Sequence, residues 1–143
     1  MRYLLDASAL VPLITKFGKD LIARAATDRF LTTDLAIYEA CNTLWKMSSL
    51  LGSISLEDGL ETVSIIRELT ERDTIHLIGV SKVELAATLR LASEQKLTFY
   101  DASYVTIAQD QRAALVTQDR ELSDVARKSV EVLNFTGLER RIS

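Results

Sequence analysis

Tyr3-Leu4-Leu5-Asp6 is the stretch of this sequence that decides the fold, because it is a short apolar run closed by an aspartate. Runs of this kind are typical of strands buried on both faces of a parallel sheet. Two later stretches suit buried strands in the same way, Ala114-Leu115-Val116-Thr117 and Val130-Glu131-Val132-Leu133. Weaker strand candidates are Phe30-Leu31-Thr32 and residues 74–78.

Stretches with a helical period separate the expected strands. The clearest carries apolar residues at steps of three and four, which fall on one stripe: Leu56, Leu60, Val63, Ile66 and Leu69. Thr33 or Asp34 can cap a helix that runs to about Leu51, and Ser55 and Ser81 can each open another. Short strands alternating with helices predict an α/β fold with a mostly parallel sheet, whose ligand sites form at the carboxyl ends of the strands.

Size and composition fit one globular domain covering residues 1–143. Apolar residues make up 48% of the chain and charged residues 26%, and the single proline, Pro12, comes too early to separate domains. No run approaches the roughly 20 apolar residues that a membrane span needs. Asp6 also interrupts the N-terminal run before a signal-peptide core can form. We therefore expect a cytoplasmic protein without membrane contact.

Composition also excludes several kinds of chemistry. Cys41 and His76 are the only cysteine and the only histidine, so the chain lacks the parts for zinc ligation or for a Ser-His-Asp triad. The net charge of -3 argues against a broad basic surface. Contact with a nucleic acid therefore requires local lysines and arginines, or metal ions.

Three aspartates fall where the sheet should present ligand groups. Asp6 directly follows the first expected strand, and Asp119 comes two residues after Thr117, which closes another. Asp101 precedes a helical run over residues 102–111, so that its side chain sits at a helix start that can face the same edge.

A fourth acid, Glu39, lies inside the expected helix over residues 34–51. Asn42 and Lys46 follow it at three and seven residues, which places all three on one helix face. The buried side of that helix can come from apolar residues that include Leu44 and Trp45.

Four carboxylates gathered within a few ångströms would repel one another unless a divalent cation neutralised them. Carboxylate oxygens suit hard ions such as Mg²⁺ or Mn²⁺, and these ions support phosphodiester cleavage by activating a bound water. Each acid alone has a structural alternative: Asp6 and Asp101 can cap helices, Asp119 can end a strand in a turn, and Glu39 can lie on a solvated face.

Longer segments surround the acids, in this order along the chain: Leu4-Leu5-Asp6-Ala7-Ser8-Ala9-Leu10, Glu39-Ala40-Cys41-Asn42-Thr43-Leu44, Phe99-Tyr100-Asp101-Ala102-Ser103-Tyr104 and Leu115-Val116-Thr117-Gln118-Asp119-Arg120-Glu121-Leu122. Together they resemble the motifs of PIN-domain ribonucleases, particularly the VapC-type toxins of type II toxin-antitoxin modules in bacteria and archaea. The resemblance covers residues 2 to about 135.

The resemblance implies a three-layer α/β/α PIN-like sandwich with a mostly parallel central sheet. It also implies Mg²⁺ or Mn²⁺ at Asp6, Glu39, Asp101 and Asp119, endonucleolytic cleavage of RNA, and a homodimer. A VapC-type member would in addition be inhibited by a cognate antitoxin. Ser8, Asn42 and Thr117 match polar positions that orient the acids or bound water in this family; each also has a plain structural role as a cap, a helix-face amide or a strand-end hydroxyl.

Other functions remain open at this point. A solitary PIN-domain nuclease of RNA processing carries the same acids, and a non-catalytic PIN-like binding module would keep them only for stability or for a partner. Aspartyl-phosphate phosphatases need Asp-x-Asp after the first strand, whereas Ser8 occupies the second position here. For RNA phosphate, the basic candidates near the acid motifs are Lys16, Lys46 and Arg120, and each of these can equally be a solvated surface charge.

Overall fold

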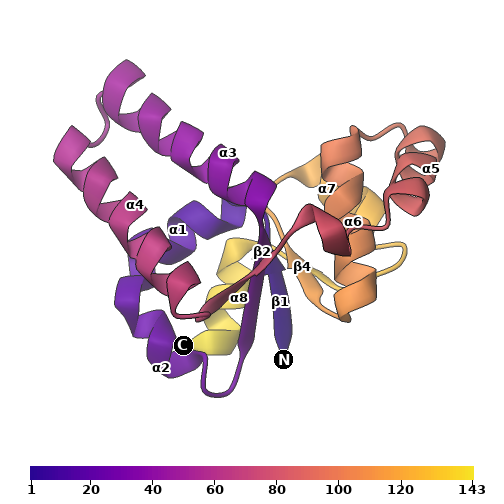
Figure 1. Ribbon diagram of the computed structural model, residues 1–143, viewed down its shortest axis with the longest axis horizontal. Coiled ribbons are helices and arrows are strands. Elements are labelled where there is room, and N and C mark those ends of the chain that lie inside the picture. Colours follow the sequence, from indigo (N-terminus) through magenta and orange to yellow (C-terminus); the bar gives the residue numbers. More distant parts are fainter.

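The structure is a computed structural model that describes residues 1–143, and its five strands form one parallel sheet (Figure 1). The strands are β1 (Arg2–Leu5), β2 (Arg29–Thr33), β3 (Ile75–Ile78), β4 (Ala114–Val116) and β5 (Val132–Leu133). Their order across the sheet is β3-β2-β1-β4-β5, and every pairing is parallel. All five expected strands are therefore confirmed, although the run at residues 130–133 pairs only over its last two residues.

The helices are α1 (Ala7–Phe17), α2 (Leu21–Arg24), α3 (Asp34–Trp45), α4 (Leu56–Glu71), α5 (Leu85–Gln95), α6 (Phe99–Gln111), α7 (Arg120–Ala126) and α8 (Phe135–Ile142). Thr33 and Ser55 cap α3 and α4 through their side chains, as the sequence predicts. The helix expected to start at Ser81 instead starts at Leu85, because residues 80–82 form a separate 3-10 turn.

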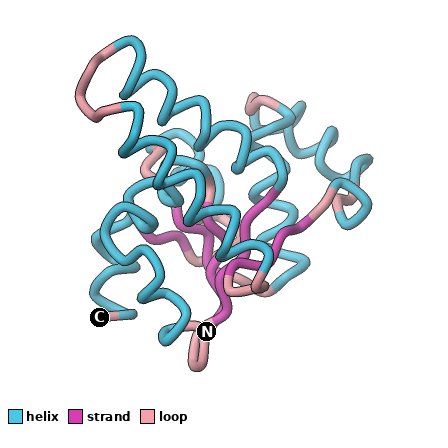
Figure 2. The backbone as a smooth tube through the Cα atoms, turned by 60° about the vertical axis from the view of Figure 1, so that its left-hand side comes forward, coloured by secondary structure: helices cyan, strands magenta, loops and turns pink.

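Helices cover both faces of the sheet, and β1 shows why (Figures 1 and 2). Tyr3 and Leu5 face a core that they share with α1, α4 and α8. Leu4 points to the opposite face, into a second core with α6 and α7. A strand apolar at every position can fill both layers, which confirms the α/β/α sandwich.

Helices α3 and α4 form a hairpin that projects from the sandwich (Figure 2). A short π-helical turn (Lys46–Leu50) extends α3 into the tip of the hairpin. The buried side of α3 consists of Ala36, Ala40 and Leu44. Trp45, which we expected on that side, is 51% exposed because it lies one residue beyond this stripe.

The strand order determines where a ligand site can form. The chain leaves β1 toward β2 and β3 on one side, and later runs from β4 to β5 on the other side. Strands β1 and β4 are therefore the neighbours between which the winding direction reverses, and their carboxyl ends border the crevice in which parallel sheets bind ligands. None of the helices has the length and apolar character needed to cross a bilayer.

Candidate active site at the carboxyl edge of the sheet

Asp6 lies at the centre of this crevice, directly after β1, and is only 6% exposed. One of its carboxylate oxygens, Oδ1, accepts hydrogen bonds from the Ser8 hydroxyl (2.6 Å) and from the Ala9 amide (3.1 Å). The other oxygen accepts a short bond from the Thr117 hydroxyl. Burial raises the pKa of Asp6, although these hydrogen bonds oppose the rise. Ser8 and Thr117 thus fix the Asp6 carboxylate, as their motif positions suggested.

Asp119 is brought to the same place by β4, the neighbour of β1. Its amide donates to the Thr117 hydroxyl (3.0 Å), and its side chain caps α7 by accepting from the Leu122 amide (3.0 Å). Thr117 therefore links the backbone of Asp119 to the carboxylate of Asp6. The amide of Gln118, between them, donates to the Ser8 hydroxyl (2.8 Å), a contact between distant parts of the chain that the sequence does not reveal.

Asp101 lies in the first turn of α6, whose cap is Thr98 (3.1 Å from the Asp101 amide). Burial raises the pKa of Asp101, and the charges of Asp119, Glu39 and Asp6 raise it further in that order. The charges of the other three acids thus act on Asp101 from the same edge of the sheet. We call Asp6, Glu39, Asp101 and Asp119 the acid cluster.

Glu39 reaches the acid cluster from α3, on the opposite helical layer from Asp101. Its Oε1 accepts a hydrogen bond from the Tyr104 hydroxyl (3.2 Å), which comes from α6. Burial, with the charge of Glu39 as a smaller contribution, raises the pKa of Tyr104, so the phenol keeps its proton and remains a donor. Tyr104 was not singled out by sequence reasoning, since its hydroxyl meets Glu39 across 65 positions of the chain only in the folded structure.

The donor set fits a hard divalent cation, because it is made only of carboxylate oxygens whose charges already disfavour one another. No three acidic, histidine or cysteine side chains converge closely enough to enclose an ion directly. Mg²⁺ usually keeps several waters and binds proteins through one or two carboxylates, so an ion held partly through water suits this geometry.

Two hollows flank the acid cluster. The α3 hollow includes Ser8, Tyr38, Glu39, Asn42 and Lys46. The α7 hollow is lined only by polar residues, among them Gln118, Asp119, Arg120, Ser123, Arg127 and Asn134.

The candidate cations differ in their freedom to meet a ligand. Lys46 and Arg120 line the two hollows without an ion pair of their own, whereas Lys16 is paired with Glu139 of α8. Of the three candidate cations, Lys16 is thus the one whose charge already has a partner within the chain. Asn42 lies on the same face as Glu39 and Lys46, as predicted, and makes no side-chain hydrogen bond within the chain.

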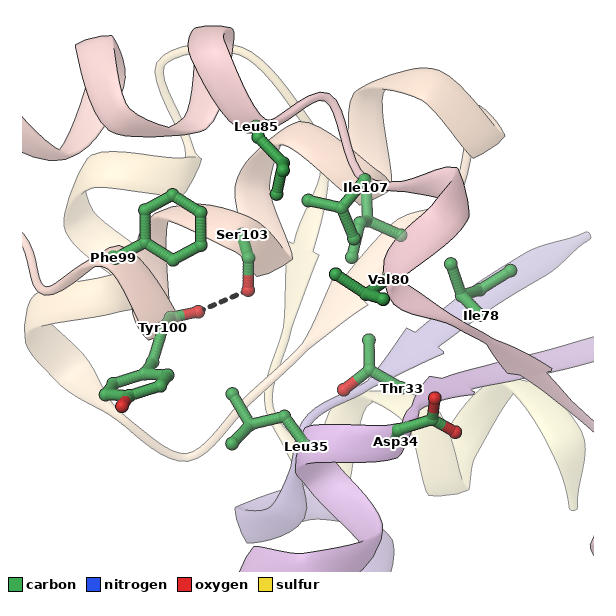
Figure 3. Close-up of a pocket in the computed structure, with 11 residues that line it drawn as sticks. Thr33, Asp34, Leu35, Ile78, Val80, Leu85, Phe99, Tyr100, Ser103 and Ile107 are labelled. Carbon is green, nitrogen blue, oxygen red and sulfur yellow. Dashed lines mark hydrogen bonds between the residues drawn. The ribbon is translucent and has the colours of Figure 1, made fainter.

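An apolar pocket also opens near Asp101, between the starts of α3, α5 and α6 and the end of β3 (Figure 3). Phe99 and Tyr100 line one side, and Leu35, Ile78 and Val80 lie opposite. The Ser103 hydroxyl donates to the Tyr100 carbonyl (2.6 Å), which tightens the turn that carries Asp101. Asp34 is the only charged residue that lines this pocket.

Comparison with known proteins identifies a family match over most of the chain and two similar relatives. The model of the PIN domain family matches residues 3–128. Two relatives come from Pyrobaculum aerophilum: Exonuclease VapC9 is 33% identical over 92% of this chain and 91% of its own length, and Ribonuclease VapC3 is 31% identical over 87% and 94%.

A solved structure is similar to this chain in both fold and sequence. The crystal structure of PAE2754 from Pyrobaculum aerophilum superimposes with a TM-score of 0.78 at 31% identity, covering 99% of this chain and 89% of that one. The acid cluster, the all-parallel sheet and the matched residues point the same way: the chain belongs to the PIN domain family and, within it, is of the VapC type.

Proposed function

We propose that this chain is a Mg²⁺- or Mn²⁺-dependent endoribonuclease and the toxin of a VapBC-type toxin-antitoxin module. The observation that carries the proposal is that four carboxylates face the β1–β4 crevice of a VapC-type chain, where burial and then the charges of the other three raise the pKa of Asp101. A structural set of acids would be paired with cations, and these are not. Perturbed acids in a cleft are a signature of functional sites.

The residues of the site would have different roles in hydrolysis. Asp6, Glu39, Asp101 and Asp119 would hold the divalent cation, which when bound neutralises the phosphate and makes an attacking water more acidic. Ser8 and Thr117 keep the Asp6 carboxylate in one orientation, and Tyr104 does the same for Glu39.

In the reaction, the oxygen of a water forms a bond to phosphorus while the bond from phosphorus to one ribose oxygen breaks. One proton leaves the attacking water, and one reaches the departing oxygen. Lys46 and Arg120, on either side of the acid cluster, would bind the negative phosphate oxygens of the strand.

The name Exonuclease VapC9 states a mode of cleavage for that relative, whereas the name Ribonuclease VapC3 states a substrate and leaves the mode open. Open hollows on both sides of the acid cluster favour cleavage within a strand, because a chain passing from the α3 hollow to the α7 hollow needs no free end. An exonuclease would require one side to be closed against the continuing strand.

The projecting α3–α4 hairpin exposes apolar side chains that a protein partner could cover. Large apolar side chains are exposed along α3, its tip and α4: Tyr38, Trp45, Leu50, Leu51, Leu56, Leu60 and Val63. Exposed apolar surface of this kind marks sites of protein association. We propose that the chain forms a homodimer and binds a cognate antitoxin, and light scattering on the chain alone and with the product of an adjacent small gene tests both.

The activity is tested with four substrates: linear RNA, RNA blocked at both ends, circular RNA and DNA of the same sequence. We expect cleavage of all three RNAs with Mg²⁺ or Mn²⁺, none in EDTA, and no comparable cleavage of DNA. Cleavage that persists in EDTA contradicts the metal requirement. Cleavage confined to unblocked ends makes the chain an exonuclease, and equal cleavage of DNA removes the RNA specificity.

A further inference from the structure

The α7 hollow is lined by two carboxylates, Asp119 and Asp124, and by a larger set of side chains that can donate hydrogen bonds. Arg120 and Ser123 of α7 and Arg127, which caps its carboxyl end, lie at steps of three and four, so that they share one face of the helix. The Arg120 side chain makes no ion pair or hydrogen bond, and the Ser123 hydroxyl makes no hydrogen bond within the chain. Arg127 has only an exposed contact of 3.9 Å with Asp124, which is weak at that separation.

Two amide side chains complete the opposite wall. The Gln118 Oε1 accepts from the Phe135 amide (2.7 Å), and the Asn134 Oδ1 accepts from the Gly137 amide (2.8 Å). The start of α8 thus occupies both carbonyl oxygens and leaves both NH₂ groups as unused donors. Guanidinium, hydroxyl and amide donors around a hollow of about 380 Å³ suit an anion with several acceptor oxygens.

The hollow contains no apolar or aromatic lining residue on which a base could stack. It shares Asp119 with the acid cluster, so an anion bound there lies next to the reacting phosphate. We propose that the α7 hollow binds an internal backbone phosphate of the RNA strand, adjacent to the phosphate that is cleaved. The inference rests on the proposed function only in taking RNA as the substrate, and it implies binding at this point without regard to base sequence.

The test measures binding apart from cleavage. Full-length Asp101→Asn protein in EDTA is titrated into labelled single-stranded RNA of several sequences, between about 50 and 200 mM salt. Adding Arg127→Gln should raise the Kd about tenfold for every sequence at low salt, and should reduce the slope of log Kd against log salt by about 0.7 for one lost phosphate contact. Adding Asp124→Asn should lower the Kd, because it frees the Arg127 guanidinium.

Arg112→Gln is the matched control, since it removes an exposed arginine at the amino edge of the sheet. If Arg127→Gln changes neither Kd nor slope more than this control, the proposal is wrong. It is also wrong if the arginine effect appears only with RNA that carries a terminal phosphate. In metal-containing wild-type background, Arg127→Gln should raise KM with kcat unchanged. RNA binding that responds to Arg127 without any cleavage by the wild type would overturn the enzymatic function but not the phosphate site.

Discussion

Acidic side chains have opposite surroundings at the two edges of the sheet. At the amino edge, Asp73 lies between Arg29 (3.0 Å) and His76 (2.7 Å), and hydrogen bonds from His76 and Arg29 lower the pKa of Asp73. At the carboxyl edge, Asp6 and Asp101 have no cationic partner, and burial raises the pKa of both. The amino edge pairs its acid with basic side chains, whereas the carboxyl edge leaves its acids without a cationic partner, as the proposed cation site requires.

The direction of each pKa change on folding determines how that carboxyl alters the stability of the fold as the pH changes. A carboxyl whose pKa is lowered on folding stabilises the fold above its unfolded pKa, and this contribution is lost as pH falls through the folded value. Asp73 follows this rule. A carboxyl whose pKa is raised on folding does the reverse, so ionisation of Asp6 and Asp101 lowers stability as pH rises from about 4 through their folded values.

The largest expected effect is on RNA cleavage, which should depend on an acid at the carboxyl edge of the sheet but not on one at the amino edge. Asp101→Asn should lower RNA cleavage at least about a hundredfold, because it removes a charge that holds the cation. Asp73→Asn, the same chemical change at the amino edge, should leave cleavage at the wild-type rate. Initial rates on one RNA at saturating Mg²⁺ make the comparison. Comparable losses in the two variants, with both still folded by circular dichroism, would mean that the edges do not differ in function.

A smaller effect concerns stability and pH. In EDTA, the contribution of Asp6 and Asp101 to the free energy of unfolding of wild type should fall as pH rises from about 4 to 7, because burial raises the pKa of both carboxyls. Asp101→Asn should flatten this fall and be at least as stable as wild type at pH 7. Mg²⁺ should raise the melting temperature of wild type more than that of the variant, since ligand binding stabilises the folded state. Denaturant titrations at each pH measure the slopes; a wild-type curve parallel to that of Asp101→Asn contradicts the electrostatic account.

The smallest effect is at the amino edge itself. Asp73→Asn should lower the free energy of unfolding by about 0.5 kcal/mol at pH 7 and low salt, because the ion pair with Arg29 and the hydrogen bond with His76 are both exposed. The loss should shrink in high salt, which screens such pairs. Thermal denaturation at two salt concentrations checks this. A stabilising effect of Asp73→Asn would show that the amino edge also keeps charge at a cost.

Local sequence patterns predicted much of the fold. The alternation of strands and helices, the caps Thr33 and Ser55, and the shared face of Glu39, Asn42 and Lys46 were all correct. These features depend on residues within a few positions of one another. The errors arose where packing outweighed local preference: Ser81 became part of a 3-10 turn, and Trp45 lies at the edge of a buried stripe.

The sequence by itself determined the strands and most of the helix starts, and it singled out the four acids as candidates, because periodicity, capping and short motifs depend on neighbouring residues. Only the tertiary structure decided that Thr117 holds Asp6 across 111 positions, that Tyr104 donates to Glu39, and that Lys16 is tied to Glu139. The tertiary structure also assembled the α7 hollow from α7 and the start of α8. The physical reason is that such contacts follow from strand order and helix packing, which bring together side chains that no local pattern relates.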